Sequence, residues 1–379
     1  MRLPIHAKSS SVRLMDAARY ADRLARVRDG LERHEAAWLL VPPSGDFRWL
    51  TGAAARSTER LVVLAVPRRG DPFCLVPRLE ADALAAECPW LELEVWEERE
   101  DPLARLARRL DLESKPRLLL GDGFRTASLL ALVARTECRT AGAVLGTLRL
   151  IKDADEIRAA QKAGRDADRV IEEAADFMRP GMTERRIERF IFERFEDLGD
   201  AAPWAIVASG PHAALPHHMT SARTLREGDV VVLDLGATVE GYGSDITRTF
   251  WLSDPPAEAE RVYQTVLQAQ RAGVAASRDG VPAEAVDRAA RGVIEAAGYG
   301  EFFVHRTGHG VGLEIHEPPY LVAGNLEPLR SGMIHSVEPG IYLPGRFGVR
   351  IEDLVVVGAD GAIVLNHAPC DPRPARVRA

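Results

Sequence analysis

The chain contains little cysteine, almost no lysine and no long hydrophobic run. Its four cysteines, Cys74, Cys88, Cys138 and Cys370, lie far apart and show no CxxC spacing. This argues against a disulfide framework or a thiolate zinc site and is typical of reduced thiols in a reducing compartment. No run approaches the length that spans a bilayer, and the segment 1–14 lacks the apolar core of a signal peptide. We therefore expect a cytoplasmic protein without a membrane segment.

The distribution of charge does not indicate a large anionic partner. Lysine occurs only at positions 8, 115, 152 and 162, and arginine supplies the other basic residues. The 49 basic and 56 acidic residues give a net charge of −7, and the arginines are spread along the chain. Neither a nucleic acid nor an anionic membrane is indicated as a partner. With 379 residues, 46% of them hydrophobic, the chain is expected to form two globular domains.

Residues 1–148 show an alternation of short apolar runs and helical patterns. Apolar residues at helical spacing predict a helix from Val12 to about Glu35. Apolar runs at 61–66 and 73–76 flank a turn that contains Gly70 and Asp71, which predicts a hairpin. Further strands are expected at 37–41, 91–96 and 117–121, alternating with helices at 79–87, 102–110 and 126–136. The prediction is an α/β domain without a catalytic motif, whose roles are pocket shaping and dimerisation.

Residues 149–379 have a different pattern, which includes an internal repeat. Two helices are expected, over 153–178 and 183–198. The segment 180–199 aligns without gaps on 279–298, an offset of 99 residues, and the bounding glycines coincide. We therefore predict an α+β domain of two similar halves, each built of two helices followed by strands.

Two acidic residues interrupt an apolar hairpin pattern in the segment 230–250. Asp234 and Asp245 lie on its two arms, and their midpoint falls between Val239 and Glu240 in the expected turn. The two aspartates should then lie on facing strands, opposite each other or close to it. Like charges across a ladder are destabilising, and apolar strands would not hold them without a neutralising cation. For this stretch alone, a solvated hairpin edge with two incidental aspartates is the alternative.

The same arrangement occurs a second time. Glu338 and Glu352 interrupt two apolar runs, and their midpoint is Gly345 in the turn Pro344-Gly345. Chance could produce one such pair of buried acids, but it is much less expected to produce two. We therefore interpret both pairs as parts of one site.

Histidines are concentrated in the same part of the chain. Seven of the ten lie between residues 212 and 335, namely His212, His217, His218, His305, His309, His316 and His335. Gly308, Gly310 and Gly312 around His309 would allow the close backbone approach that a buried ligand needs. These glycines look like a dinucleotide motif, but no helical pattern follows Pro318-Pro319, which argues against it.

The acids and one histidine make a consistent set of metal ligands. Asp234, Asp245, Glu338, Glu352 and His309 offer four carboxylates and one imidazole without a thiolate. This set suits two hard or borderline divalent ions, such as manganese, cobalt or zinc. Two ions about 3.5–4 Å apart can activate water as a nucleophile at neutral pH.

Four motifs resemble those of the pita-bread metallopeptidases, in the proline-specific branch of prolidase and aminopeptidase P: LDLGATVEGYGSDITRT, GHGVGLEIHE, SVEPGIY and GVRIED. The strong resemblance covers about residues 150–367. The N-terminal domain resembles the creatinase-type domain of the family more weakly, through FRWLTG at 47–52. The resemblance implies a pita-bread fold for the C-terminal domain, two divalent ions per chain with manganese as the first candidate, and a homodimer.

The resemblance also implies a role for each ligand. Asp245 and Glu352 match the residues that bridge the two ions in the family, and Asp234 matches a ligand of one ion. His309 and Glu338 match ligands of the other ion. Glu338 is further implied as a catalytic residue that relays a proton to the leaving nitrogen.

Four further residues match positions near the substrate. His217 and His316 match histidines beside the scissile bond, and His305 and Arg350 match positions that line the proline pocket. An arginine there would pair with the carboxylate of a dipeptide. The alternatives are a structural role for His217 and an outward-pointing Arg350. His212 and His335 depart from the family pattern, which has an asparagine and a bulky apolar residue there, and their roles stay open.

The implied function is that of an Xaa-Pro dipeptidase, which hydrolyses the peptide bond before proline. The alternative is an Xaa-Pro aminopeptidase that acts on longer peptides, because the sequence does not show whether the N-terminal domain blocks the pocket. A catalytically silent binding module is a more distant alternative. The retention of all five ligands argues against it and against creatinase chemistry, and methionine aminopeptidases lack a large N-terminal domain.

Overall fold

The computed structural model describes residues 17–373. The segment 1–14, on which the expectation about a signal peptide rests, and the first residues of the expected helix before Ala17 lie outside this range. The chain divides into two compact units, Met1–Arg149 and Leu150–Ala379. Within the described range, none of the helices combines the length and the apolar character that crossing a bilayer requires.

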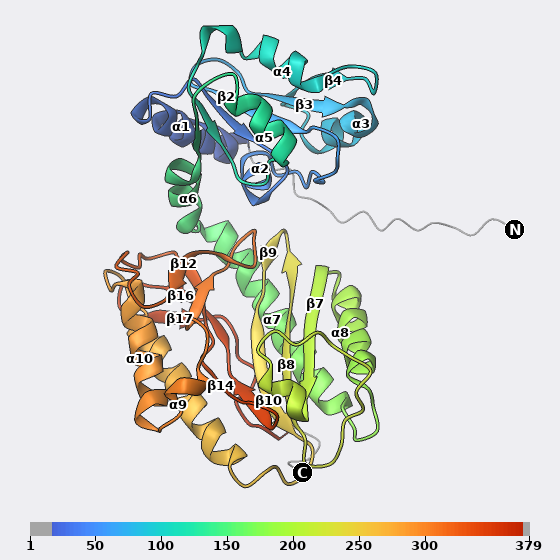
Figure 1. Ribbon diagram of the computed structural model, residues 1–379, viewed down its shortest axis with the longest axis vertical. Coiled ribbons are helices and arrows are strands. Elements are labelled where there is room, and N and C mark those ends of the chain that lie inside the picture. The colour runs from blue at the N-terminus through green and yellow to red at the C-terminus, as the bar shows by residue number, and fades with distance from the viewer. Residues whose placement is uncertain (1–16, 374–379) are drawn as a thin grey trace, which may run out of the picture. The chain divides into compact units, whose positions relative to one another are not determined.

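The N-terminal unit is built around one sheet of six strands in the order β4-β3-β2-β1-β5-β6 (Figure 1). Its elements are α1 (Ala17–Arg33), β1 (Trp38–Val41), α2 (Gly45–Thr51), β2 (Val63–Pro67), β3 (Phe73–Pro77), α3 (Arg78–Glu87), β4 (Glu92–Trp96), α4 (Pro102–Arg109), the 3-10 helix η1 (Leu112–Ser114), β5 (Leu118–Leu120), α5 (Thr126–Val133), β6 (Cys138–Thr140) and α6 (Gly142–Leu150). The expected hairpin is present, because β2 and β3 pair antiparallel. The sheet is mixed, with β1 parallel to β5 and antiparallel to β2. The α/β prediction is confirmed.

Helix α2 is one of the elements that the sequence pattern did not indicate. It spans only seven residues, too few to show a helical period. Local signals define both of its ends, because the side chain of Ser44 accepts a hydrogen bond from the amide of Phe47, and Gly52 adopts the left-handed conformation. The segment FRWLTG is therefore a short capped helix, with Phe47 and Trp49 buried.

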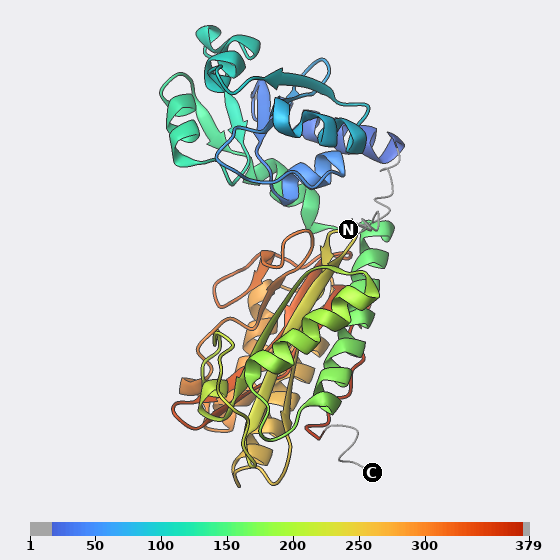
Figure 2. The ribbon, with the colours of Figure 1, turned by 90° about the vertical axis from the view of Figure 1, so that its right-hand side faces the viewer.

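The C-terminal unit contains an antiparallel sheet in the order β10-β8-β7, a second in the order β12-β11-β13-β16-β17, and the separate pair β14-β15. Its elements are α7 (Ala154–Phe177), α8 (Glu184–Leu198), β7 (Ala201–Ser209), the 3-10 helix η2 (Gly210–Ala214), β8 (Val230–Val239), β9 (Tyr242–Gly243), β10 (Ile246–Trp251), α9 (Ala259–Ala276), α10 (Ala283–Ala296), the 3-10 helix η3 (Gly300–Phe302), β11 (Gly308–Gly310), β12 (Glu317–Leu321), β13 (Ile334–Val337), β14 (Gly340–Leu343), β15 (Phe347–Arg350), β16 (Asp353–Val357) and β17 (Ala362–Val364). Helices α7 and α8 pack against the first sheet (Figures 1 and 2). Helices α9 and α10 pack together and contact strands that follow them in the chain.

The order of elements confirms the predicted repeat. Helices α7 and α8 are followed by antiparallel strands, and so are α9 and α10. At an offset of 99 residues, the start of α8 at Glu184 falls on the start of α10 at Ala283. Ile187 and the matching Val286 are both fully buried. The fold class, an α/β unit followed by an α+β unit of two similar halves, is therefore as predicted.

The first acidic hairpin is centred between Glu240 and Gly241, one residue after the midpoint of Asp234 and Asp245. Its turn consists of Glu240 and Gly241, both with positive φ (51° and 90°), which is the geometry of a two-residue type I′ hairpin. Asp234 therefore pairs with Thr247, not with Asp245. Asp245 precedes Thr247 by two residues, so it lies diagonally across from Asp234 on the same face.

The second acidic hairpin has the predicted register. Leu343 pairs with Phe347 around Gly345, whose φ is 71°. The same register continues from β14-β15 into β13-β16, where Val337 pairs with Asp353. Glu338 and Glu352 therefore lie opposite each other, at the junction between the pair β13-β16 and the pair β14-β15.

A backbone bridge between Thr247 and Glu352 helps to join the two hairpins. Thr247 of the first forms an isolated antiparallel bridge with Glu352 of the second, and the amide of Glu352 donates to the carbonyl of Thr247 at 3.1 Å. The hydroxyl of Thr247 also donates to Glu352 Oε2 at 2.6 Å. These contacts bring the acids of both hairpins to one place.

Candidate metal centre

A cavity of about 400 Å³ lies within the C-terminal unit. All nine residues that the sequence proposed for the site line it, namely Asp234, Asp245, His309, Glu338 and Glu352 as ligands, and His217, His305, His316 and Arg350 near the substrate. Trp204, Ile206 and Arg306 also line it. The sequence did not indicate these three, because nothing local connects them to the acidic hairpins.

His309 is oriented so that one ring nitrogen faces the acids. Its Nε2 lies 3.3 Å from Glu338 Oε1 and 3.7 Å from Asp245 Oδ2. Its Nδ1 lies 3.1 Å from the carbonyl oxygen of Gly310, to which it donates. Burial, and then the nearby His316, lower the pKa of His309 to about 3. The imidazole is therefore neutral and presents a lone pair toward the acids, as a metal ligand must.

Burial and mutual repulsion disfavour simultaneous ionisation of Asp245, Glu338 and Glu352. Burial raises the pKa of Asp245 well above its ordinary value, and the charges of Glu352, Asp234 and Glu338 raise it further. Burial, and then Glu338 and Asp234, likewise raise the pKa of Glu352. Burial raises the pKa of Glu338 to about 7, although Arg350 opposes this. Divalent ions in the cluster would remove this repulsion.

The residues present fit a divalent metal. Asp245, His309 and Glu352 can each offer one ligand atom, and these atoms lie within 4.8 Å of one another. Asp234 Oδ1 is buried and, among the residues that the structure describes, has no hydrogen-bond partner. A buried carboxylate oxygen without a partner is costly, so an ion is the natural occupant of the space beside it.

Arg350 lies inside the site, not on an outward face. Only 4% of it is exposed, and its Nη2 lies 2.5 Å from Asp234 Oδ2. Its Nε donates to the hydroxyl of Thr247, and its Nη1 donates to the hydroxyl of Tyr342 and the carbonyl of Pro216. Its position on the cavity agrees with the expectation, but most of its donors already have partners in the protein.

His305 is held in one orientation at the same wall. Its Nδ1 donates to the carbonyl of Arg306 at 2.7 Å, so its Nε2 accepts from the hydroxyl of Tyr342 at 2.9 Å. Burial, and then Arg350, lower the pKa of His305 to about 4, which keeps it neutral. Tyr342 thus connects Arg350 to His305. The sequence reasoning missed Tyr342, although it lies in SVEPGIY, the same motif that contains Glu338.

Two histidines lie at the cavity without strong constraints of their own. The ring of His316 meets that of His309 edge-on, with 4.1 Å between centroids, and burial lowers the pKa of His316. His217 is exposed on a turn, and its side chain has no hydrogen-bond partner in the range 17–373. Both rings are therefore available to a bound substrate.

Arg306 is the cation of the cavity whose guanidinium forms no ion pair or hydrogen bond within the described residues, although its charge lowers the pKa of Glu338. Its guanidinium stacks over the ring of Tyr320, with 4.4 Å between its central carbon and the ring centroid. The stacking holds a planar, charged donor group in the same cavity as the acids and His309.

The glycines around His309 and the histidine at position 335 have structural roles. A Cβ on Gly308 would lie 2.1 Å from the carbonyl oxygen of Ser336, and one on Gly310 equally close to that of Pro318. The expected close backbone approach at these glycines is present, because neighbouring strands lie directly against them and His309 between them is buried. His335 is fully buried, donates from Nδ1 to the carbonyl of Ser336, and does not line the cavity.

We expect the metal-free protein to become less stable as the pH rises from about 4.5 to about 7. The pKa of Glu338 is about 7 in the folded protein, against an ordinary value of 4.5. Between these values the folded state binds more protons than the unfolded state, so stability falls with increasing pH. Thermal unfolding of the chelator-treated protein at pH 5 and pH 8 measures this, with Glu338→Gln as a variant that cannot ionise.

The midpoint of the Glu338→Gln variant should fall less between the two pH values than that of the wild type. Manganese should raise the wild-type midpoint more at pH 8 than at pH 5. Parallel pH profiles for the two metal-free proteins would show that Glu338 is not the group responsible.

Known proteins resemble both parts of the chain. Residues 158–359 match the family model of metallopeptidase family M24, and residues 23–151 match that of the creatinase/prolidase N-terminal domain. The probable dipeptidase PepE of Mycobacterium tuberculosis is 42% identical over 370 residues, which cover 94% of this chain and 97% of that protein.

Two solved structures illustrate the similarity of fold. The prolidase from Thermococcus sibiricus is 37% identical, with a TM-score of 0.88, over 92% of this chain and 97% of that one. The X-Pro aminopeptidase from Thermotoga maritima is 28% identical, with a TM-score of 0.78, over 90% of this chain and 99% of that one. The C-terminal unit therefore has the pita-bread fold, and the N-terminal unit is of the creatinase type.

Proposed function

The chain belongs to metallopeptidase family M24, and on this premise we propose that it is an Xaa-Pro dipeptidase. One feature of the cavity carries the proposal: the cluster of acids and His309 shares its space with the unpaired guanidinium of Arg306. The names of two similar proteins, a probable dipeptidase and a prolidase, support the same substrate class.

We propose that the five predicted ligands hold two divalent ions. Asp245 and Glu352 would bind both ions. Asp234 would complete the coordination of one ion, and His309 and Glu338 would complete that of the other. Arg350 occupies only Oδ2 of Asp234, which leaves Oδ1 for an ion. The four carboxylates balance the charge of two divalent cations, and manganese is the first candidate, with cobalt or zinc as alternatives. When bound, such ions polarise the peptide carbonyl and activate water.

The side chains around the ions bind and orient the peptide. His217 and His316 lie on the cavity where a ring N–H can donate to the carbonyl oxygen as negative charge develops there. Glu338 can pass a proton to the leaving nitrogen of proline. The hydrogen bonds from Arg350 to Tyr342 and from Tyr342 to His305 hold the neutral His305 in place at the pocket wall.

Arg306 provides the reason to favour dipeptides. A dipeptide that ends in proline carries a free carboxylate next to the scissile bond, whereas a longer peptide has an amide there. Arg350 already pairs with Asp234, so Arg306 is the cation with donors to spare. A charge-assisted pair with Arg306 would stabilise the dipeptide complex and not that of a longer peptide.

Turnover of Ala-Pro and Ala-Pro-Ala with manganese tests this directly. We expect faster hydrolysis of Ala-Pro, because only the dipeptide places a carboxylate within reach of Arg306. Faster hydrolysis of the tripeptide would instead assign the chain as an Xaa-Pro aminopeptidase. Hydrolysis of neither peptide by protein that holds its metal would contradict both assignments and favour a binding module.

We further propose that the chain forms a homodimer, as the resemblance to its family implies. Sedimentation of the purified protein checks this, and a monomer at micromolar concentration would contradict it. The cytoplasmic location stays a prediction, which fractionation of the source cells would test.

A further inference from the structure

The carboxylate of Glu184 is the centre of a second polar cluster, outside the residues that line the cavity. Glu184 begins helix α8 and is fully buried. Six donors surround its two oxygens. Oε1 accepts from the amide (2.9 Å) and hydroxyl (2.7 Å) of Ser209 and from His212 Nδ1 (3.0 Å). Oε2 accepts from His218 Nε2 (3.1 Å) and from the amide (3.1 Å) and hydroxyl (2.6 Å) of Ser221. Burial raises the pKa of Glu184, but these hydrogen bonds outweigh it and lower the pKa to about 2. Its hydrogen bonds therefore favour the ionised form of the carboxylate.

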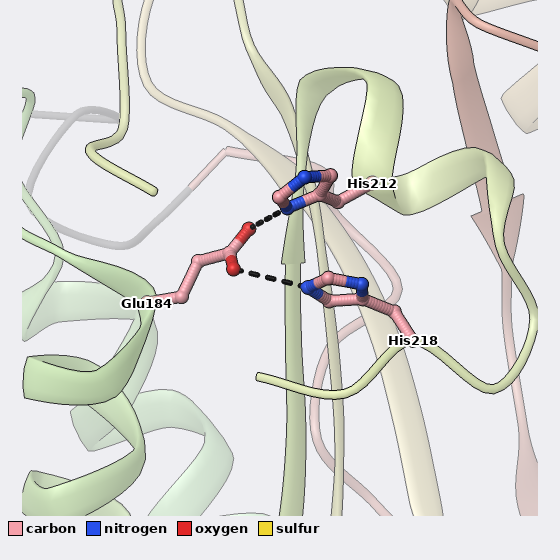
Figure 3. A group of neighbouring side chains, drawn as sticks. All are labelled: Glu184, His212 and His218. Carbon is pink, nitrogen blue, oxygen red and sulfur yellow. Dashed lines mark hydrogen bonds and ion pairs between the residues drawn. The ribbon is translucent and has the colours of Figure 1, made fainter. Parts of the chain in front are cut away.

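This carboxylate holds both ends of one loop. Ser209 ends strand β7, and Ser221 follows the loop that starts there. Between the two serines, the amide of His218 donates to the carbonyl of Leu215 at 3.1 Å, which closes a turn with Pro216 and His217 at its corner. His212 and His218 lie on either side of that turn, and Figure 3 shows their rings reaching the two oxygens of Glu184 from different parts of the chain.

The position of His217 depends on this turn. Its side chain is exposed and, within residues 17–373, has no hydrogen bond that would fix it. The carbonyl of the preceding Pro216 accepts from Arg350 Nη1 at 3.3 Å, and Arg350 in turn contacts Asp234. The turn is thus tied to Glu184 on one side and to the metal ligands on the other.

The geometry points to Glu184 as a positioning residue, which holds the turn so that His217 faces the scissile bond. This inference rests on the proposed function, because it is the peptide that gives the position of His217 its importance. A small error in the position of a catalytic group lowers the rate strongly, so an ionised anchor with six donors has a clear use.

The cluster does not have the arrangement of a metal site, although Glu184, His212 and His218 are of ligand type. Each carboxylate oxygen already accepts three hydrogen bonds, one of them from a backbone amide. The two imidazole nitrogens point at different oxygens, not at a common position (Figure 3). An ion would have to displace donors that belong to the fold itself.

A double-mutant cycle at His212 and His217 tests the inference. Removing Glu184 itself would leave six donors without an acceptor, whereas His212 is partly exposed, with 32% of its side chain accessible. We expect His212→Leu to lower kcat for Ala-Pro roughly 10-fold, because the turn loses one anchor. His212→Asn should stay within about twofold, because the amide nitrogen of asparagine can replace Nδ1 as the donor. Met219→Ala, at a residue 84% exposed in the same loop, is the matched control and should leave kcat unchanged.

The effect of His212→Leu should disappear when His217 is already alanine, because nothing is then left to position. Independent, multiplying losses would overturn the inference, and so would a loss that merely follows a loss of bound metal. Wild-type turnover by His217→Ala would remove the catalytic role of His217 and the inference with it. If the wild type binds a third zinc ion and His212→Leu does not, the cluster around Glu184 is a metal site instead.

Hydrogen exchange separates this inference from the proposed function. Amide exchange across residues 209–221 should accelerate in His212→Leu and not in His212→Asn or Met219→Ala, with or without a substrate. If the wild type hydrolyses no Xaa-Pro peptide, the proposed function fails, and this comparison still decides whether Glu184 anchors the turn. Unchanged exchange in His212→Leu would overturn it.

Discussion

Replacing Asp245 with alanine is expected to abolish metal binding and peptide hydrolysis together. Asp245 is 3% exposed, and His309 and Glu352 can offer ligand atoms within 4.8 Å of its own. Removal of a bridging carboxylate from a proposed pair of ions would eliminate their contribution to catalysis. We expect a loss in kcat/KM of at least ~10³-fold for Ala-Pro, since metal ions supply several kcal/mol of transition-state stabilisation. Elemental analysis and steady-state kinetics on the same sample measure both effects.

Two controls separate a local effect from misfolding. The metal-free Asp245→Ala variant should melt no lower than the metal-free wild type at pH 8, because burial and neighbouring acids destabilise the ionised Asp245. Asp168→Asn changes another buried carboxyl group, which accepts hydrogen bonds from the amides of His367 and Ala368 and does not line the cavity. It should reduce stability but retain metal and turnover. An active Asp245→Ala variant that binds two ions would contradict the proposed centre.

Replacing Arg306 with glutamine is expected to change specificity more than catalysis. Loss of a charge-assisted pair with the substrate carboxylate costs about 2–3 kcal/mol, which corresponds to a fall in kcat/KM for Ala-Pro of roughly 10²-fold. The amide of the same dipeptide lacks that carboxylate, so its kcat/KM should change by less than about threefold. Parallel kinetics with the dipeptide and its amide measure the difference.

Arg346→Gln is the matched control for this prediction. Arg346 follows strand β14, pairs with Glu258 at 2.8 Å and does not line the cavity, so its loss should affect neither substrate. Arg306→Lys should retain part of the preference for the dipeptide, because an ammonium group keeps the charge but not the planar pair of donors. Equal losses for the dipeptide and its amide would show that Arg306 acts on the acids of the centre and not on the substrate carboxylate.

The second acidic hairpin shows how much of the site is local. Glu338 and Glu352 stand seven residues before and after Gly345, and the observed register pairs the intervening strands around that glycine. The turn residues and the alternation of side chains are sufficient to predict this pairing. In the first hairpin the turn is centred one residue after the midpoint of the two aspartates, because Glu240 and Gly241 both adopt a positive φ, so Asp245 lies diagonally across from Asp234 and not directly opposite it.

The sequence by itself determined the family and fold of the protein and predicted the chemistry of its centre. The repeated helix pair, the four acids at hairpin spacing and His309 all follow from patterns within a few residues, where chain geometry limits the possible pairings. These patterns predicted the two-part fold and a set of oxygen and nitrogen donors that suits divalent ions.

Only the tertiary structure decided which neighbours these residues have. Arg350 contacts Asp234, which is 116 residues away, and Thr247 contacts Glu352 across 105 residues. The six donors around Glu184 come from a loop that starts 25 residues later, and no periodicity connects them to that helix start. The physical reason is that such contacts depend on how separate hairpins and helices pack, and packing selects among many partners that the local sequence permits equally.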